Sequence, residues 1–137
     1  MNQITENTRI TELDTDECWA ALESQQLGRF AVRVGDGVDI FPVNYLLNNH
    51  TIYFRSAPGS KLMDLTNSPT VAFEADGRVQ QRYWSVVVHG TAARLMSDAD
   101  IEESGVLALR TWSATEKFNY VRITPTTITG RRFLRQF

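Results

Sequence analysis

Alternation of apolar and polar side chains in the first half of this chain is the feature that most restricts its fold. The stretch GRFAVRV (28–34) points its larger apolar residues one way and its arginines the other, as expected for a strand with one buried face. Turn residues at 35–37 and 48–50 separate it from two runs rich in β-branched and aromatic residues, 38–47 and 51–56. Three strands joined by such short turns predict an antiparallel meander.

Capping pairs and apolar spacing predict the other elements. Asp14, with Glu17 three residues later, predicts the start of a helix that ends near Gln26. The remaining predicted elements are a helix at 61–67, strands at 70–76 and 83–95 joined by a polar loop at 77–82, a helix at 97–110, and a final strand at 117–133. Pro42 predicts an edge position or a bulge, and Gly90 predicts a bulge or bend.

These elements predict a mainly β fold. Six short strands dominate, hairpin-length connections make them antiparallel, and no repeating βαβ unit is present. A six-stranded antiparallel β-barrel with peripheral helices satisfies this order and removes most exposed sheet edges. Residues 1–13 are expected to be a flexible N-terminal segment, and residues 14–137 are expected to form a single domain.

Composition restricts location and partners. The chain has 137 residues and a net charge of −2, so no global attraction to nucleic acid or to an anionic membrane is expected. No apolar run approaches the length of a membrane span, and the N-terminus lacks the features of a signal peptide. Cys18 is the only cysteine, which excludes a disulfide within the chain. A cytoplasmic location is therefore the expectation.

For most catalytic chemistries, the sequence contains no matching residue pattern. His50, His89 and Cys18 have no spacing typical of a metal site, so no metal is expected. No nucleophile elbow, Walker motif or dinucleotide-binding glycine pattern is present. Cys18 shares an apolar face with Trp19 and Leu22, which favours a place in the core. No catalytic residue is identified.

The stretch FRSAPGSKL (54–62) carries the clearest binding signal. A strand followed by Gly and Ser at a helix start points backbone N–H groups outward, where the helix dipole favours an anion. Lys61 would add a point charge, Arg55 a bidentate fork, and Ser56 and Ser60 hydroxyl groups. A phosphate cradle and a capped helix with two solvated cations remain alternatives at this point.

The same residues, taken in series with others, resemble a known family. LGRFAV, FPVNYLL, IYFRSAPGSKL, SPTVAFEAD, YWSVVVHGTAARL and RITPTTITGRR are together similar to the flavin-binding split-barrel family of the pyridoxamine 5′-phosphate oxidases. The similarity is greatest to its short members, including the 5-nitroimidazole-resistance proteins, and spans residues 14–132. The resemblance implies a single FMN-binding split-barrel domain over residues 14–137.

The resemblance also implies a homodimer with two flavin sites at the subunit interface. Lys61 matches the phosphate lysine of the family, whereas Ser60 stands where arginine is common, and Arg131 matches a segment near the flavin of the partner subunit. The cofactor-binding residues implied are Val43, Asn44, Tyr45, Phe54, Arg55, Ser56, Ser60, Lys61, Trp84, Ser85 and Arg131. The chain is much shorter than the true oxidases, so vitamin B6 oxidation is not implied.

The function expected is an FMN-binding oxidoreductase acting on an unidentified small molecule, with a nicotinamide as the candidate electron donor. A deazaflavin-dependent reductase and a non-catalytic flavin-binding or sensor domain are the alternatives. Trp84 and Tyr45 could equally be core aromatics, and Arg131 could belong to a solvated tail. Phe133, Leu134 and Phe137 make the end of the chain apolar, so they are expected to dock, with the partner subunit as the candidate surface.

Overall fold

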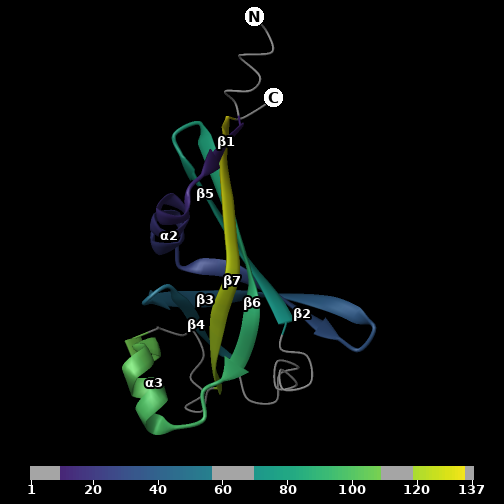
Figure 1. Cartoon of the computed structure of the whole chain (residues 1–137), viewed down its shortest axis with the longest axis vertical. Coiled ribbons are helices and arrows are strands. Elements are labelled where there is room, and N and C mark those ends of the chain that lie inside the picture. Colours follow the sequence, from purple (N-terminus) through teal and green to yellow (C-terminus); the bar gives the residue numbers. More distant parts are fainter. Residues whose placement is uncertain (1–9, 57–69, 109–118, 135–137) are drawn as a thin grey trace, which may run out of the picture.

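The computed structural model describes residues 10–56, 70–108 and 119–134 of the chain, which form one antiparallel sheet with helices at its periphery (Figure 1). The elements are β1 (Ile10–Leu13), α2 (Thr15–Glu23), β2 (Leu27–Val34), β3 (Gly37–Asn48), β4 (Thr51–Ser56), β5 (Thr70–Val79), β6 (Arg82–Arg94), α3 (Asp98–Ser104), the 3₁₀ turn η2 (Val106–Ala108) and β7 (Asn119–Leu134). The predicted helix at 61–67 lies outside the described residues.

The strand pairings close into a ring, as predicted for a split barrel. The sheet order is β1-β7-β4-β3-β2-β5-β6, and β6 also pairs with β7, so β2 to β7 form a six-stranded circuit. A seventh strand, β1, pairs with the far end of β7 from Ile10↔Phe133 to Leu13↔Gly130. The strand count of six was therefore one short, because Ile10–Leu13 form a strand within the segment expected to be flexible.

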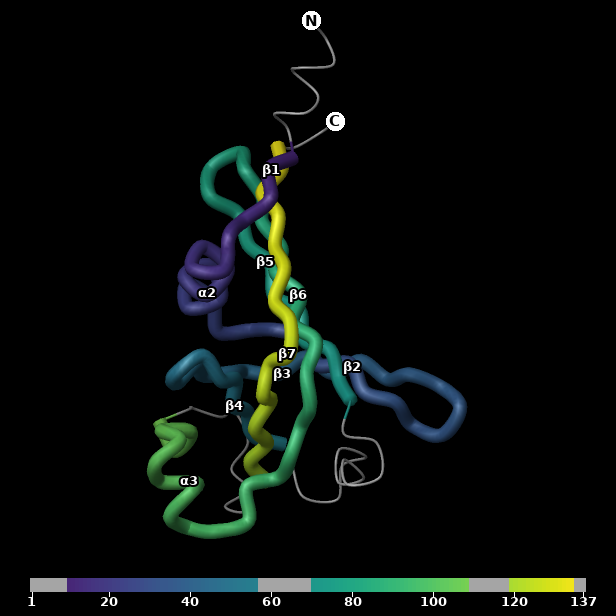
Figure 2. The backbone as a smooth tube through the Cα atoms, viewed as in Figure 1, coloured from purple at the N-terminus to yellow at the C-terminus, as the bar shows by residue number. Residues whose placement is uncertain are grey.

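Part of the sheet extends beyond the ring as an arm. β5 continues to Val79 and β6 begins at Arg82, so the predicted polar loop at 77–82 is instead a tight hairpin. The end of this hairpin, the second half of β7 and β1 make up the arm, which occupies the upper half of the molecule in Figures 1 and 2. Residues 77–82 are half-buried or exposed, so their polar side chains indicated a loop.

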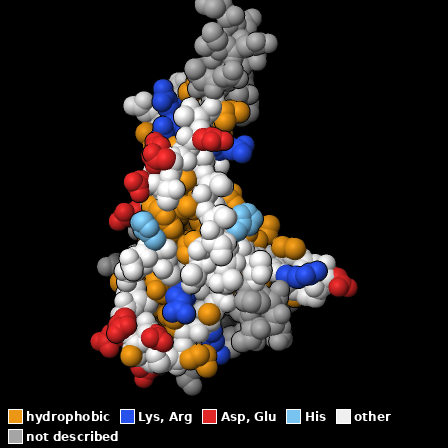
Figure 3. All heavy atoms as spheres, in the orientation of Figure 1, with side chains coloured by type: hydrophobic (Ala, Val, Ile, Leu, Met, Phe, Trp, Pro, Cys, Tyr) orange, Lys and Arg blue, Asp and Glu red, His pale blue; other side chains and the backbone are white. Residues whose placement is uncertain are grey.

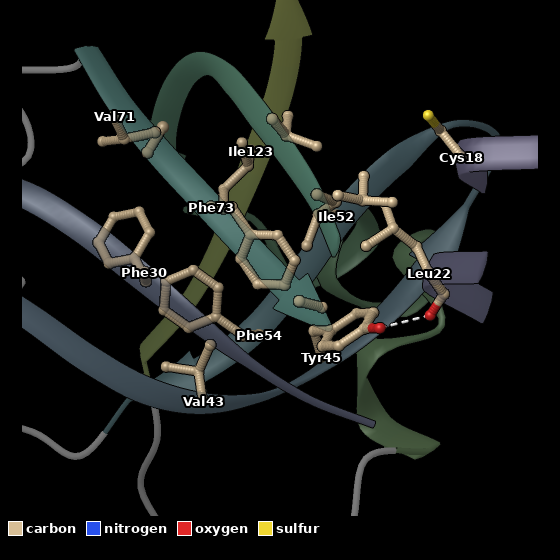
Figure 4. Packing of buried hydrophobic residues seen from close by; sticks show 14 of the residues in the cluster. Cys18, Leu22, Phe30, Val43, Tyr45, Ile52, Phe54, Val71, Phe73 and Ile123 are labelled. Carbon is tan, nitrogen blue, oxygen red and sulfur yellow. Dashed lines mark hydrogen bonds between the residues drawn. The ribbon is translucent and has the colours of Figure 1, made fainter. Parts of the chain in front are cut away.

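The core fills the ring. The side chains of Phe30, Phe54 and Phe73 are fully or almost fully buried and converge with Ile52 and Ile123 (Figure 4). The Phe30 and Phe54 rings lie with centroids 4.9 Å apart and tilted by 50°. Burial of large aromatic and β-branched side chains from strands distant in sequence stabilises the closed ring.

The helices begin where the capping patterns predicted. The Asp14 side chain accepts a hydrogen bond from Glu17 N, and the Glu17 carboxylate accepts one from Asp14 N, which completes the capping box of α2. Ser97 caps α3 through Asp100 N. α3 ends at Ser104 rather than near residue 110, because Gly105 adopts a left-handed conformation (φ 80°) that terminates the helix.

Two predicted irregularities are present. The pairing register between β6 and β7 shifts at His89/Gly90. This shift confirms the bulge predicted there. Pro42 lies in the part of β3 that pairs with β2 but not with β4. On its other side, β3 therefore has no hydrogen-bonded β4 strand at Pro42. The edge position expected for this proline is confirmed.

Candidate functional site

The predicted cofactor residues of β3 lie on two faces of the strand. Val43 and Tyr45 are buried in the core and Asn44 is exposed, as alternation along a strand requires. The Tyr45 hydroxyl donates a hydrogen bond to the carbonyl oxygen of Leu22 in α2, and its ring meets Phe73 edge-on at 4.9 Å (Figure 4). Burial raises the pKa of the Tyr45 hydroxyl above its ordinary value. Only Asn44 offers its side chain to the outer face.

The end of β4 leads into the predicted phosphate loop. Phe54 is fully buried and belongs to the core, while Arg55 is partly exposed and lies opposite Tyr120 of β7. Ser56 is 8% exposed, and its Oγ finds no hydrogen-bond partner within the described part of the chain. A buried hydroxyl without a partner costs about 1–3 kcal/mol, so its presence requires an explanation. Ser60 and Lys61 lie outside the described residues.

The other predicted cofactor residues lie on the arm. Ser85 and Arg131 are directly opposed on β6 and β7, so both belong to one face of the sheet. Trp84 is 7% exposed and lies opposite Arg132, so it belongs to the opposite face. Trp84 and Ser85 therefore cannot both present their side chains to the same side of a ligand, although they are adjacent in sequence.

A single chain does not bring the two groups of residues together. Arg55 pairs with Tyr120 near the start of β7, whereas Ser85 pairs with Arg131, eleven residues further along the same strand. At about 3.3 Å per residue this spacing corresponds to roughly 35 Å along the strand. The long β7 in Figure 2 runs between these two positions.

A charged cluster that sequence reasoning missed lies on the outer face of β2 and β5. Arg29 Nη1 contacts Glu74 Oε1 at 3.1 Å and Asp76 Oδ2 at 3.2 Å. Burial and the neighbouring Asp76 raise the pKa of Glu74, against the opposing effect of Arg29. Asp76 is also directly opposed to Ser85, so the cluster continues toward the arm residues. The sequence did show two acids, Glu74 and Asp76, on the same face of one strand. Their pairing with Arg29 could not be predicted, because it depends on the register between β2 and β5.

The two histidines and the single cysteine occupy structural positions. The His50 ring stacks on Trp19 with centroids 4.7 Å apart, which joins the β3–β4 turn to α2. His89 lies at the bulge, where its carbonyl oxygen accepts a hydrogen bond from Thr126. Cys18 is fully buried and packs in the core, as predicted. Within the described ranges no three potential metal ligands cluster.

The apolar end of the chain is partly accounted for. Phe133 stacks on Tyr83 with ring centroids 5.8 Å apart, and both Phe133 and Leu134 are partly buried in β7. Phe133 therefore packs against its own chain, and Phe137 lies outside the described residues. The helices of the described ranges are all too short to cross a bilayer.

Acidic side chains gather over both helices on the face shown in Figure 3. The α2 cap and first turn carry Asp14, Asp16 and Glu17, and α3 carries Asp98 and Asp100 in its first turn. These carboxylates match the positive ends of the two helix dipoles, so they stabilise the helices without requiring a ligand.

Comparison with known proteins connects this geometry to a family. A model of the pyridoxamine 5′-phosphate oxidase family matches residues 14–132. A candidate pyridoxamine 5′-phosphate oxidase from Corynebacterium glutamicum is 41% identical with a TM-score of 0.84, over 94% of this chain and 96% of that one. An FAD-binding protein from Mycobacterium smegmatis is 40% identical with a TM-score of 0.79, over 92% and 100% of the two chains. An FAD-binding protein from Mesorhizobium loti is 25% identical with a TM-score of 0.80, over 92% and 98%.

Proposed function

The chain belongs to the pyridoxamine 5′-phosphate oxidase family, and we propose that it is a flavin-dependent oxidoreductase that acts on a small molecule. The proposed cofactor is FMN, or FAD held through the FMN half that the two flavins share. The descriptions of two relatives as FAD-binding proteins support a flavin nucleotide at this site. The single cysteine, which excludes an internal disulfide, fits the proposed cytoplasmic location.

The Ser56 hydroxyl is the observation that carries the proposal. It is buried and without a hydrogen-bond partner in the described residues, at the point where β4 enters the segment that contains Ser60 and Lys61. A phosphate oxygen would accept a charge-assisted hydrogen bond from this hydroxyl, which would offset the cost of burying it. The residues present therefore fit a flavin phosphate, with Lys61 as the proposed counter-charge.

The proposed site is shared between two chains of a homodimer. Arg55 and Ser56 lie near the start of β7, while Ser85 and Arg131 lie about 35 Å away along it. If both groups contact one flavin, they must come from different subunits. Each dimer would then hold two equivalent sites, related by the two-fold symmetry that homodimers usually have.

The chemistry of such a site comes largely from the cofactor. A bound flavin supplies hydride or electron exchange with a small molecule, and a nicotinamide is the proposed electron donor. The protein binds the phosphate through Ser56 and Lys61, and Asn44 is the β3 side chain exposed on the outer face. Core packing of Val43 and Tyr45 holds the β3 backbone rigid beside the proposed ring site.

Phosphate binding is tested by comparing FMN with riboflavin, which lacks the phosphate. Ser56→Ala should weaken FMN binding by about tenfold, the usual effect of losing a hydrogen bond to a charged group, and leave riboflavin binding unchanged. Lys61→Ala should show the same selectivity. Ser104→Ala is the matched control, because that buried hydroxyl already bonds Ile101 O and Val106 N. It should destabilise the fold and spare both flavins. Equal losses for FMN and riboflavin would refute the phosphate role.

Complementation tests the shared site. Lys61→Ala and Arg131→Gln homodimers should each bind FMN weakly, because every site carries one defect. A heterodimer of the two variants should contain one intact site and one doubly defective site, and should bind close to one FMN per dimer with wild-type affinity. A heterodimer as weak as its parents would refute the shared site, while leaving phosphate binding by Ser56 to be judged separately.

A further inference from the structure

A hollow of about 600 Å³ lies between α2 and the arm, on the face opposite Ser85 and Arg131. Its wall on α2 includes Ala20 and Ala21, and its wall on the arm includes Trp84 and Arg132. The volume falls within the range of small-molecule sites, about 300–1,000 Å³. Figure 1 shows α2 lying beside the arm. The lining residues place the hollow between the two.

Small side chains on α2 keep the hollow open. Ala20 is exposed and Ala21 partly buried, and both line the hollow together with the largely buried Trp84. A Leu or Phe at either position would occupy the space that these alanines leave. The wall also includes Leu13 and Val79, so most of the lining can contact a flat apolar body.

The charge at the hollow is positive. Arg82 and Arg132 both line it, and Glu17 supplies the only carboxylate that the described residues contribute to the lining. Glu17 Oε2 lies 3.7 Å from Arg132 Nη2, which is long for a charge-assisted hydrogen bond, and its other oxygen caps α2 by accepting from Asp14 N. The hollow therefore has two guanidinium groups and one carboxylate, and that carboxylate also caps α2. This leaves an excess of hydrogen-bond donors for an anion.

We propose that this hollow binds a planar aromatic anion, with the ring against Trp84 and a carboxylate or phosphate on Arg132 and Arg82. The site is separate from the proposed flavin site, because Trp84 and Arg132 lie on the opposite face of the arm from Ser85 and Arg131. Trp84, which sequence similarity associated with the flavin, is assigned to this second ligand instead. The proposal stands whether or not a flavin binds at Ser56.

Calorimetric titration of the purified full-length protein with 2-naphthoate tests the proposal. A dissociation constant below about 1 mM is expected for a ligand of this size in a matching site. 2-Naphthyl phosphate distinguishes the two anion sources: tighter binding of one compound identifies that headgroup, and binding of either supports the site. Naphthalene-2-methanol, which carries no charge, should bind at least tenfold more weakly; equal binding would overturn the anionic role.

Variants locate the binding within the hollow. Arg132→Gln should weaken 2-naphthoate binding about tenfold, and Ala20→Phe should abolish it by filling the space. Glu17→Gln keeps an amide that can complete the α2 cap but removes the competing charge, so binding should tighten about two- to fivefold. That gain would not arise if Arg132 were only structural.

Two controls lie elsewhere on the molecule. Arg33→Gln removes an exposed arginine at the β2–β3 hairpin, and Ala108→Phe adds the same ring beyond α3. Both should bind 2-naphthoate like the wild type. No binding by the wild type, or equal effects of the pocket and control variants, would overturn the proposal. Displacement of bound flavin by 2-naphthoate would overturn the assignment of a separate site.

Discussion

Gly130→Ala is predicted to loosen the contact between α2 and the arm. Gly130 lies in β7 directly opposite Leu13 of β1 and Val86 of β6, under the buried thiol of Cys18. A Cβ at this position would lie 2.8 Å from Cys18 Sγ, 3.1 Å from Leu13 Cδ1 and 3.1 Å from Val86 Cγ2. All three neighbours belong to the core, so they cannot move into solvent to make room.

The expected cost follows from these distances. Carbon contacts are most favourable at about 3.5–4.0 Å, so the new methyl would be too close to three groups at once. Inserting a methyl into a packed core costs about 1–3 kcal/mol, and three simultaneous contacts favour the upper half of that range. Replacing glycine within a strand returns about 0.5–1 kcal/mol by reducing chain entropy. A net loss of about 1–2.5 kcal/mol in the free energy of unfolding is therefore expected.

Urea unfolding followed by tryptophan fluorescence measures this loss. Gly37→Ala is the matched control, because a Cβ there would meet only Val34 O at 3.7 Å, an ordinary contact, so it should be neutral or slightly stabilising. In a Cys18→Ala background the shortest contact of Gly130→Ala disappears, and its cost should fall by about 1 kcal/mol. The reasoning is refuted if Gly130→Ala is as stable as Gly37→Ala, or if its cost is unchanged in the Cys18→Ala background.

Three further predictions concern buried polar groups. Tyr45→Phe removes the donor to the Leu22 carbonyl and should lower the free energy of unfolding by about 1–2 kcal/mol in urea titrations; an unchanged midpoint would contradict that bond. Burial raises the pKa of the Cys18 thiol, so it should react with a disulfide reagent at pH 8 far more slowly in the folded protein than in urea, and equal rates would argue against its burial. Burial and Asp76 raise the pKa of Glu74 above its ordinary 4.5, so the folded state holds this proton more tightly than the unfolded chain does. This tighter proton binding stabilises the folded state fully below pH 4.5, and the stabilisation is lost as the pH rises. The free energy of unfolding of the wild type should therefore fall relative to that of Glu74→Gln from pH 4.5 upward. The opposite slope would exclude this cause.

The barrel could be predicted from local sequence because its strands bury one face. Alternation predicted β2 to β4, the Asp14 and Glu17 pair predicted the start of α2, and Gly90 marked the bulge. The arm parts of β6 and β7 lie within strands that were predicted, but the hairpin end at 77–82 and β1 were not. Residues 77–82 are mostly polar and exposed, so they indicated a loop. β1 is only four residues long, and its partner in β7 is more than a hundred residues away in sequence.

The candidate site could be predicted only in part, for a similar reason. Alternation along a strand separates Trp84 from Ser85, and the two faces could have been assigned from sequence. The distance between Arg55 and Arg131 depends instead on how far β7 pairs first with β4 and then with β1. That pairing is set by tertiary contacts, so the two groups of site residues become distinct only in the folded chain.

The visible absorption spectrum of the freshly purified protein, with mass identification of whatever is released on denaturation, tests the flavin proposal most directly. The proposal predicts a flavin spectrum and release of FMN or FAD in a ratio approaching one per chain. Release of a deazaflavin would retain the site and correct the cofactor. A colourless protein that also fails to bind added FMN and FAD would contradict the proposed function.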